Sequence, residues 1–130
     1  MEIVFVPNKD FARVELDKIQ VQQVILNLLR NAKEAMQESN TINPKITINV
    51  SSKGNNYIIV RIVDNGPGFS EQIAHRLFDL YFTTKPQGMG LGLAICRSII
   101  EAHSGQLSVS LLPEGGSCFE FELPISTNLV

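Results

Sequence analysis

Hydrophobic positions along the chain follow two different periods, which divide the sequence into predicted helices and strands. From Asp17 to about Glu38 the apolar residues recur every three or four positions, as on one face of a helix; they are Val21, Val24, Ile25, Leu28, Leu29, Ala32, Ala35 and Met36. Asp17 is a suitable N-cap for this helix. A second helix is expected from about Gly90 to His103, ended by Gly105, with one face made of Leu91, Ile95, Ser98, Ile99 and Ala102.

Elsewhere the period changes to two, which predicts strands. Ile46, Ile48 and Val50 alternate with polar residues, as in a strand with one buried face. The segment 57–63 is apolar on both sides except at Arg61, so we expect a central strand there. Further strands are expected at 3–6, 107–111 and 119–123, and a short helix near 71–78.

These elements predict an α+β fold. Two amphipathic helices cannot bury their apolar faces on each other while the strands stay exposed. The arrangement that solves this is a two-layer α/β sandwich, in which both helices cover one face of a mixed, mostly antiparallel sheet. The 130 residues contain no internal repeat and no low-complexity segment, so we expect residues 1–130 to form a single domain.

Composition and charge narrow the class of protein. A hydrophobic content of 44% and a charged content of 18% are typical of a compact fold. The net charge of −2 gives no electrostatic reason to expect a nucleic acid partner. No apolar run reaches the roughly 20 residues that span a bilayer, so we expect no direct membrane insertion of this domain. Cys96 and Cys118 are interpreted as reduced core residues in a cytoplasmic setting, and a parent protein could still be membrane-anchored.

A glycine-rich stretch, Gly88-Met89-Gly90-Leu91-Gly92, comes where the second helix begins. Alternating glycines leave backbone N–H groups unshielded at a helix N-terminus, which attracts anions, so a phosphate site is predicted. The stretch is not a Rossmann loop, because Leu93 stands at the third glycine position, and no Gly-Lys-Ser/Thr follows to make a Walker loop. The alternative is a glycine-rich helix start without a ligand.

A second candidate, Asp64-Asn65-Gly66-Pro67-Gly68, directly follows the central strand. Asn-Gly and Pro-Gly are turn dipeptides, so a plain turn is the alternative interpretation. A buried carboxylate without a donor is costly, and we expect a ligand amine, such as the exocyclic N6 of adenine, to supply that donor to Asp64. Gly66 and Gly68 would then let a flat ring approach the backbone.

Two asparagines one helical turn apart, Asn27 and Asn31, interrupt the leucines of the first helix. Asn is a middling helix former, so these residues reduce helix stability without an evident structural return. Both project from one edge of the helix, and an amide oxygen suits a Mg²⁺ ion that keeps most of its waters. The alternative is a solvated polar edge, or asparagines that cap a neighbouring loop.

The segment from Phe78 to Lys85 lies between the two glycine segments. Thr83, Thr84 and Lys85 could reach a terminal phosphate while the aromatic side chains anchor a flap, and the alternative is an aromatic edge of the core. His75 and His103 belong to no recognisable nucleophile motif and have no metal-spaced partner. We therefore interpret His75 as an exposed residue and His103 as a partner of the helix dipole.

The order of these motifs resembles the ATP-binding catalytic domain of sensor histidine kinases, in the wider ATPase superfamily that includes DNA gyrase B, the heat-shock chaperone and MutL. The resemblance covers about Leu16 to Leu123: residues 23–32 resemble the N box, 64–68 the G1 box, 78–85 the F box and 88–93 the G2 box. Gly115-Gly116-Ser117 resembles the late glycine motif before the last strand. The resemblance implies a Bergerat-type ATP-binding fold, with ATP and Mg²⁺ as ligands.

The resemblance also implies a role for each motif. Asp64 would bind the adenine amine, and Gly68 would shape the base pocket. Asn31 would hold Mg²⁺ between the phosphates with Asn27 close by, Lys85 would meet the γ-phosphate, and the N–H groups from Gly88 to Gly92 would hold the phosphate chain. Residues 69–88 would order over the nucleotide.

Asn27 distinguishes between the branches of that family, and Glu34 departs from its usual pattern. The hydrolysing branches have an acidic residue as the base for water where this chain has Asn27, which favours a histidine protein kinase over a free-running ATPase. Glu34 stands where many of the kinases have a basic residue, so that phosphate contact is not expected.

The family's acceptor histidine lies on a separate dimerisation domain, and nothing before residue 16 resembles one. The expected partners are therefore such a histidine-containing domain and a downstream response regulator in two-component signal transduction. The alternatives are an ATP-driven conformational clamp of the gyrase or MutL kind, a serine kinase of the anti-sigma type, and a regulatory module that binds no nucleotide.

Overall fold

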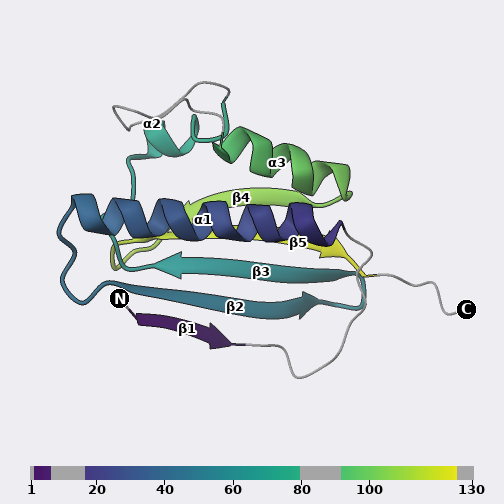
Figure 1. Ribbon diagram of the computed structural model, residues 1–130, viewed down its shortest axis with the longest axis horizontal. Coiled ribbons are helices and arrows are strands. Elements are labelled where there is room, and N and C mark those ends of the chain that lie inside the picture. The colour runs from purple at the N-terminus through teal and green to yellow at the C-terminus, as the bar shows by residue number, and fades with distance from the viewer. Residues whose placement is uncertain (1, 7–16, 80–91, 126–130) are drawn as a thin grey trace, which may run out of the picture.

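The protein has two layers, a five-stranded sheet and two helices that cover one of its faces (Figure 1). The computed structural model describes residues 2–6, 17–79 and 92–125. The strand order is β1-β2-β3-β5-β4; β1 is parallel to β2, and all other neighbours are antiparallel. The elements are β1 (Glu2–Val6), α1 (Lys18–Glu38), β2 (Lys45–Lys53), β3 (Tyr57–Asp64), α2 (Glu71–Ala74), α3 (Gly92–Ala102), β4 (Gln106–Leu111) and β5 (Ser117–Pro124). The predicted fold class is confirmed, and β3 is the central strand, as expected.

Helix α1 forms where the spacing of apolar residues predicts it. The Asp17 carboxylate accepts a hydrogen bond from the Gln20 N–H at 3.0 Å, so this residue is the N-cap. The buried residues of the helix are Val21, Val24, Leu28, Ala32 and Met36. The helix ends at Glu38 with Ser39 as its C-cap, and Asn40 then adopts a φ of +52°; the Ser39 N–H donates to the Ala35 carbonyl at 3.2 Å and the Thr41 N–H to the Met36 carbonyl at 3.0 Å. These bonds satisfy carbonyls at the C-terminus that have no partner within the helix.

Helix α3 buries a different face from the one that the sequence predicts. Of that face only Ile99 is buried; Ile95, Ser98 and Ala102 are exposed, and Leu91 lies outside the described residues. The buried residues are Ala94, Cys96, Ile99 and Ile100. The helix carries apolar side chains around much of its circumference, so its own pattern does not decide which face meets the sheet. The exposed face instead lines a surface hollow between α3 and Gln20 of α1.

The C-terminus of α3 is closed by Ser104, not by the expected Gly105. Ser104 has a φ of +62°, and its N–H donates to the Glu101 carbonyl at 2.9 Å while the Gly105 N–H donates to the Ile100 carbonyl at 2.9 Å. Gly105 is needed for a different reason. A Cβ atom at this position would lie 2.0 Å from the Glu122 carbonyl oxygen, so the turn packs directly against β5.

The hydrophobic core lies between the sheet and the helices. Cross-strand pairing places Ile62 opposite Phe119 and Val60 opposite Phe121, and all four side chains are buried. Burying each side chain of this size stabilises the fold by about 1.5–3 kcal/mol. Because side chains alternate along a strand, Asp64 points to the same face as Ile62, toward the helices. The sheet therefore delivers one carboxylate to the edge of an apolar core.

The short helix α2 ends earlier than predicted. Ser70 caps it by accepting from the Ile73 N–H at 3.2 Å, but helical geometry stops at Ala74 and irregular turns continue to Asp79. His75 follows the helix and is exposed, as expected.

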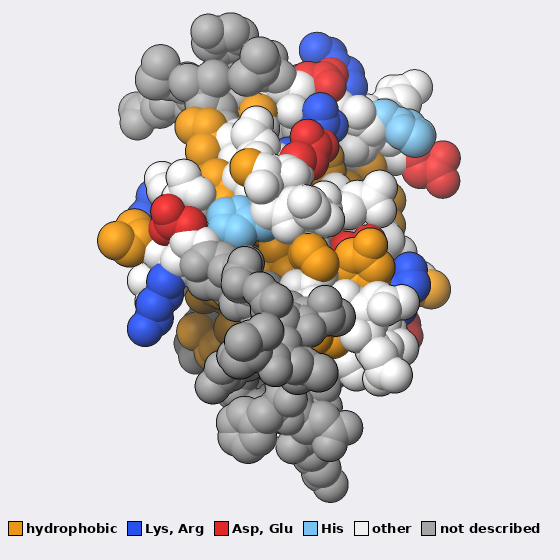
Figure 2. All heavy atoms as spheres, turned by 90° about the vertical axis from the view of Figure 1, so that its right-hand side faces the viewer, with side chains coloured by type: hydrophobic (Ala, Val, Ile, Leu, Met, Phe, Trp, Pro, Cys, Tyr) orange, Lys and Arg blue, Asp and Glu red, His pale blue; other side chains and the backbone are white. Residues whose placement is uncertain are grey.

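Among the described helices, none is both long enough and apolar enough to cross a membrane. Figure 2 shows the end of the molecule where α1 begins and α3 ends. On this face the described hydrophobic side chains form small patches among polar and charged groups of both signs.

Candidate functional site

The candidate site is built around Asp64, the last residue of the central strand. Its side chain is buried, with 5% of its surface exposed. One carboxylate oxygen, Oδ1, accepts from the Gly66 N–H at 2.9 Å, and the other, Oδ2, accepts from the Ser117 hydroxyl at 2.6 Å. Ser117 is the β5 residue paired with Asp64 in the sheet and is itself buried. Two neighbouring segments thus fix the direction of this carboxylate.

These contacts change the reason for expecting a ligand at Asp64. We expected a buried carboxylate that lacks a protein donor, and this is wrong, because Gly66 and Ser117 both donate to it. Two carboxylate oxygens offer about four acceptor positions, so two bonds do not exhaust the group. Asp64 is therefore a preoriented acceptor with capacity for a further donor.

Glycines around Asp64 allow the backbone to pack closely. A Cβ atom on Gly66 would lie 3.0 Å from Asp64 Oδ1 and 3.0 Å from Met36 Cγ. Gly68 has a φ of +72°, and a Cβ there would lie 3.1 Å from the Gly116 carbonyl oxygen. Gly116 itself has a φ of +95°, and a Cβ on it would lie 2.1 Å from the Asp64 carbonyl oxygen. The two glycine motifs, 64–68 and 115–117, are thus packed against each other.

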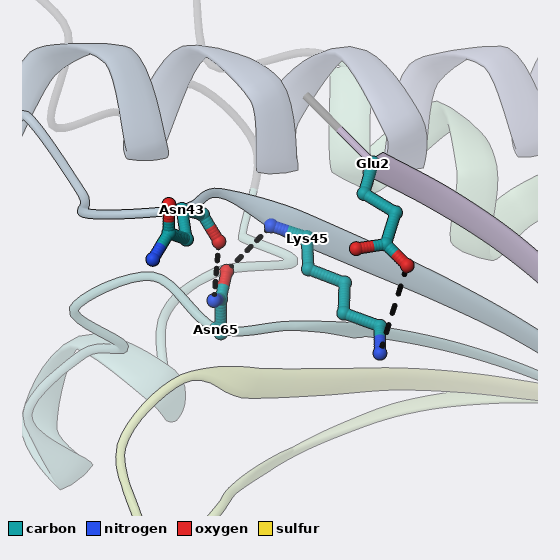
Figure 3. A network of polar contacts seen from close by, with 4 residues as sticks. All are labelled: Glu2, Asn43, Lys45 and Asn65. Atoms are coloured by element: carbon teal, nitrogen blue, oxygen red, sulfur yellow. Dashed lines mark hydrogen bonds and ion pairs between the residues drawn. The ribbon is translucent and has the colours of Figure 1, made fainter.

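Asn65 turns its side chain away from the core and holds the chain that enters β2 (Figure 3). Its Oδ1 accepts from the Lys45 N–H at 2.7 Å, and its Nδ2 donates to the Asn43 carbonyl at 3.0 Å. The Asn65 backbone N–H also donates to the Lys45 carbonyl at 3.2 Å. Nearby, the exposed Lys45 ammonium lies 4.0 Å from the Glu2 carboxylate, a contact that contributes little to stability.

The two asparagines of α1 are both half-buried on one edge of the helix. The Asn27 side chain lies beside the Cys96 thiol of α3, where the two helices meet. Burial raises the pKa of Cys96, and the neighbouring Asn27 amide opposes the shift, so the thiol stays neutral at neutral pH. Asn31 is five residues before Met36, or about 7.5 Å of helix rise, and Met36 contacts the Gly66 turn. Helix α1 therefore runs from the Cys96 contact to the Asp64 turn.

The pair of asparagines fits a Mg²⁺ ion that is held mainly by water and phosphate. Their amide oxygens are neutral hard ligands, and Mg²⁺ commonly uses one or two protein oxygens and keeps several waters. Within the described ranges, no group of three or more His, Cys, Asp or Glu side chains is placed to hold a metal ion by itself. A cation at this edge would thus need further oxygen ligands, such as those of a nucleotide.

Aromatic residues anchor the segment that follows the Asp64 turn. Phe78 contacts Phe119 edge-to-face, with ring centroids 6.3 Å apart, and Phe69 contacts the same ring at 6.4 Å. The Arg97 guanidinium of α3 lies over the Phe78 ring at 5.9 Å. We expected residues 69–88 to order over a nucleotide, and the described part of that segment, 69–79, is attached to the core at Phe69 and Phe78.

Several predicted phosphate-binding residues fall outside the described ranges, so their placement stays a prediction; they are Thr83, Thr84, Lys85, Gly88, Met89, Gly90 and Leu91. Gly92 is described as the first residue of α3, and its position is exposed with open space around it. The start of α3 is therefore compatible with the predicted phosphate contact at its N-terminus.

His103 has a structural role that the sequence did not reveal. Its Nδ1 contacts the Ile99 carbonyl at 2.8 Å, and its Nε2 accepts from the Asp17 N–H at 2.8 Å. The ring therefore joins the end of α3 to the start of α1. We had interpreted His103 only as a partner of the helix dipole.

Two contributors to the site were missed by sequence reasoning. Ser117 orients Asp64, and Cys96 contacts Asn27. The Gly115-Gly116-Ser117 motif was a signal for Ser117, because this hydroxyl residue follows two glycines at the point where the last strand begins. Cys96 gave no local signal, because its contact depends on how two distant helices pack.

Comparison with known protein families agrees with this geometry. A family model described as histidine kinase-, DNA gyrase B-, and HSP90-like ATPase matches residues 16–127. Sensor protein TdiS of Thauera aromatica is 47% identical over 114 residues, which cover 86% of this chain and 21% of TdiS. Sensor protein FixL of Bradyrhizobium diazoefficiens is 43% identical over 108 residues, which cover 83% of this chain and 21% of FixL. The chain thus spans about a fifth of the length of these curated relatives.

Solved structures show the same architecture. The nucleotide-free catalytic domain of the histidine kinase ThkA has a TM-score of 0.81 and 36% identity, covering 95% of this chain and 78% of that one. Full-length ShkA in complex with AMPPNP has a TM-score of 0.83 and 25% identity, covering 99% of this chain and 26% of ShkA.

Proposed function

The chain belongs to the family of histidine kinase-, DNA gyrase B-, and HSP90-like ATPases, in the branch of the sensor histidine kinase catalytic domains, and from this we propose that it binds ATP with Mg²⁺ and transfers the γ-phosphoryl group to a histidine on a separate dimerisation domain. The observation that supports the proposal most is the buried Asp64 carboxylate, oriented by Gly66 and Ser117 and still able to accept. A purine amine is a suitable donor for such a group.

Each part of the nucleotide is assigned to a motif. Asp64 accepts from the adenine amine, and Gly66 and Gly68 form the wall beside the base. Asn31 and Asn27 hold the cation that neutralises the phosphates. The terminal phosphate is assigned to Thr83, Thr84 and Lys85, and the phosphate chain to the backbone N–H groups of Gly88, Met89, Gly90, Leu91 and Gly92.

Transfer to a histidine fits Asn27 better than hydrolysis does. An amide cannot take a proton from water, so the site has no general base at this position. In the proposed step, the lone pair of a histidine ring nitrogen attacks the γ-phosphorus and forms an N–P bond. The bond between the γ-phosphorus and the β–γ bridging oxygen breaks, and ADP keeps that electron pair. The domain contributes positioning and charge neutralisation, as phosphoryl transfer generally requires.

The setting of the domain is part of the same proposal. We infer that residues 1–130 act as one catalytic domain and that the acceptor histidine belongs to the same longer protein, because the curated relatives are several times longer than the matched region. A response regulator would receive the phosphoryl group next. We place the domain in the cytoplasm, whether or not its parent protein is membrane-anchored, and expect it neither to bind nucleic acid nor to insert into a membrane.

Two assays test this function. Calorimetric titration of the chain with ATP, in the presence and absence of Mg²⁺, should show binding that Mg²⁺ strengthens, and a lack of binding would point to a regulatory module without nucleotide. Incubation of the full-length protein with γ-labelled ATP should then label a residue whose phosphate is lost in acid, as expected for phosphohistidine. An acid-stable label would indicate a serine kinase. Steady ATP hydrolysis by the isolated domain would favour a conformational clamp.

A further inference from the structure

The turn after β3 is held from outside by the side chain of Asn65. Its amide uses both ends, accepting at 2.7 Å from the Lys45 N–H and donating at 3.0 Å to the Asn43 carbonyl (Figure 3). The Asn65 N–H adds a third bond to the Lys45 carbonyl at 3.2 Å. We call these three bonds the Asn65 clasp. The clasp joins the end of β3 to the segment that enters β2, about twenty residues earlier in the chain.

The clasp depends on the side chain of one residue only. Asn43 and Lys45 contribute backbone atoms, whereas Asn65 contributes its amide. Asn43 has a φ of +51°, so its carbonyl is presented by a backbone conformation that glycine adopts readily. Replacing either partner's side chain should therefore leave the clasp in place, and replacing Asn65 should open it.

Asn65 is also the middle residue of the turn that orients Asp64. The Asp64 Oδ1 atom accepts from the Gly66 N–H, so this bond closes a loop around Asn65. The direction of the Asp64 carboxylate thus depends on the backbone angles of Asn65. The clasp fixes those angles from the solvent side, because the Asn65 side chain points away from Asp64.

We propose that Asn65 is a positioning residue for base recognition: the Asn65 clasp holds the Asp64 turn in its binding geometry before the nucleotide arrives. The inference rests on the proposed function, in which Asp64 accepts from the adenine amine. A turn that is already ordered need not be ordered at the moment of binding, and preorganisation of this kind raises affinity. The Asn65 clasp acts on recognition of the base, so its contribution to affinity should be the same for nucleotides that differ only in their phosphates.

The test compares Asn65→Ala with two control variants in the same network, by calorimetric titration with ATP, ADP and GTP. Asn65→Ala removes two side-chain hydrogen bonds, each worth about two- to twelvefold in an equilibrium constant, and we expect ATP and ADP to bind about tenfold more weakly, by the same factor. The preference for ATP over GTP should narrow as well, which a loss of stability alone would not cause. Lys45→Ala and Asn43→Gly keep the backbone partners and should bind like the wild type.

Asn65→Asp serves as a second variant if Asn65→Ala fails to fold. It keeps the acceptor for the Lys45 N–H but places an oxygen against the Asn43 carbonyl, so it should also bind ATP and ADP more weakly by one common factor. Wild-type affinity in both folded Asn65 variants would overturn the inference, and so would a loss confined to ATP. If the wild type itself binds neither ATP nor ADP, the proposed function fails, which is a different result from a clasp that has no effect.

Discussion

The sharpest prediction concerns Asp64→Asn, which changes one buried atom. The asparagine keeps an oxygen toward the Gly66 N–H, and its new NH₂ group faces the Ser117 hydroxyl at the position of Oδ2. A hydroxyl can rotate to accept a hydrogen bond, so both protein contacts persist. The substitution should therefore cost only about 1 kcal/mol of stability. Asp64→Ala would instead leave both donors unpaired in the core and could cost several times as much.

Nucleotide affinity should change far more than stability. A hydrogen bond to a charged acceptor is worth about 1.5–3 kcal/mol, so its loss predicts a 10- to 150-fold weaker ATP affinity. The new NH₂ group cannot accept from the adenine amine, but it can donate to the O6 atom of guanine. Asp64→Asn should thus lose ATP affinity and gain preference for GTP relative to the wild type, which should itself strongly prefer ATP.

Calorimetric titration with ATP and GTP measures both effects, and thermal unfolding checks the fold in parallel. Glu38→Gln, at the exposed end of α1, is a control that removes one negative charge elsewhere on the surface. Equal affinity of the wild type for ATP and GTP, or unchanged ATP affinity in Asp64→Asn, would refute the assignment of the base to Asp64.

Three further predictions follow from the same account. Lys85→Ala should weaken ATP binding more than ADP binding in a titration, because only ATP has the third phosphate; equal losses would give this lysine another role. Gly116→Ala should lower the free energy of unfolding by at least about 2–3 kcal/mol in denaturant titrations, because its φ is +95° and its Cβ would lie 2.1 Å from a β3 carbonyl oxygen. Gly115→Ala, at a φ of +99° in open space, should cost less, and an equal cost would show that the β3 contact is unimportant. Burial raises the pKa of Cys96 and of Cys118, so the thiols lose their protons at a lower pH in the unfolded chain than in the folded one. The free energy of unfolding should therefore fall as the pH rises above the ordinary thiol pKa of about 8.5. If Cys96→Ala leaves the slope of the free energy of unfolding against pH unchanged, that thiol makes no contribution.

Local signals predicted most of the fold. The span of α1 was predictable because its apolar spacing, its Asp17 cap and the polar loop after it all lie within one segment. The central position of β3 was predicted from a segment that is apolar on both sides except at Arg61, and the structure does place a strand at each of its edges, although the described helices cover only one face of the sheet. The buried face of α3 was not, because Ile95 and Cys96 are both apolar and only packing against the sheet decides which is buried.

The candidate site, like the fold, was predictable from the sequence only in part. The Asp64 and Asn27 motifs stand out because carboxylates and amides are unusual beside apolar runs. Their immediate partners do not stand out, because Ser117 is 53 positions from Asp64 and Cys96 is reached only across two helices. At the end of α3 the residue with positive φ is Ser104, whereas Gly105 is required because the Glu122 carbonyl of β5 lies too close for a Cβ atom. Tertiary contacts therefore set the geometry of the site, and sequence sets its chemistry.

A crystal structure of the chain with Mg²⁺ and a non-hydrolysable ATP analogue tests the central claim most directly. The account predicts the exocyclic amine of the base about 2.7–3.2 Å from an Asp64 carboxylate oxygen, with the cation next to Asn31 and the phosphates at the start of α3. A base bound away from Asp64, with the carboxylate still held only by Gly66 and Ser117, would contradict it.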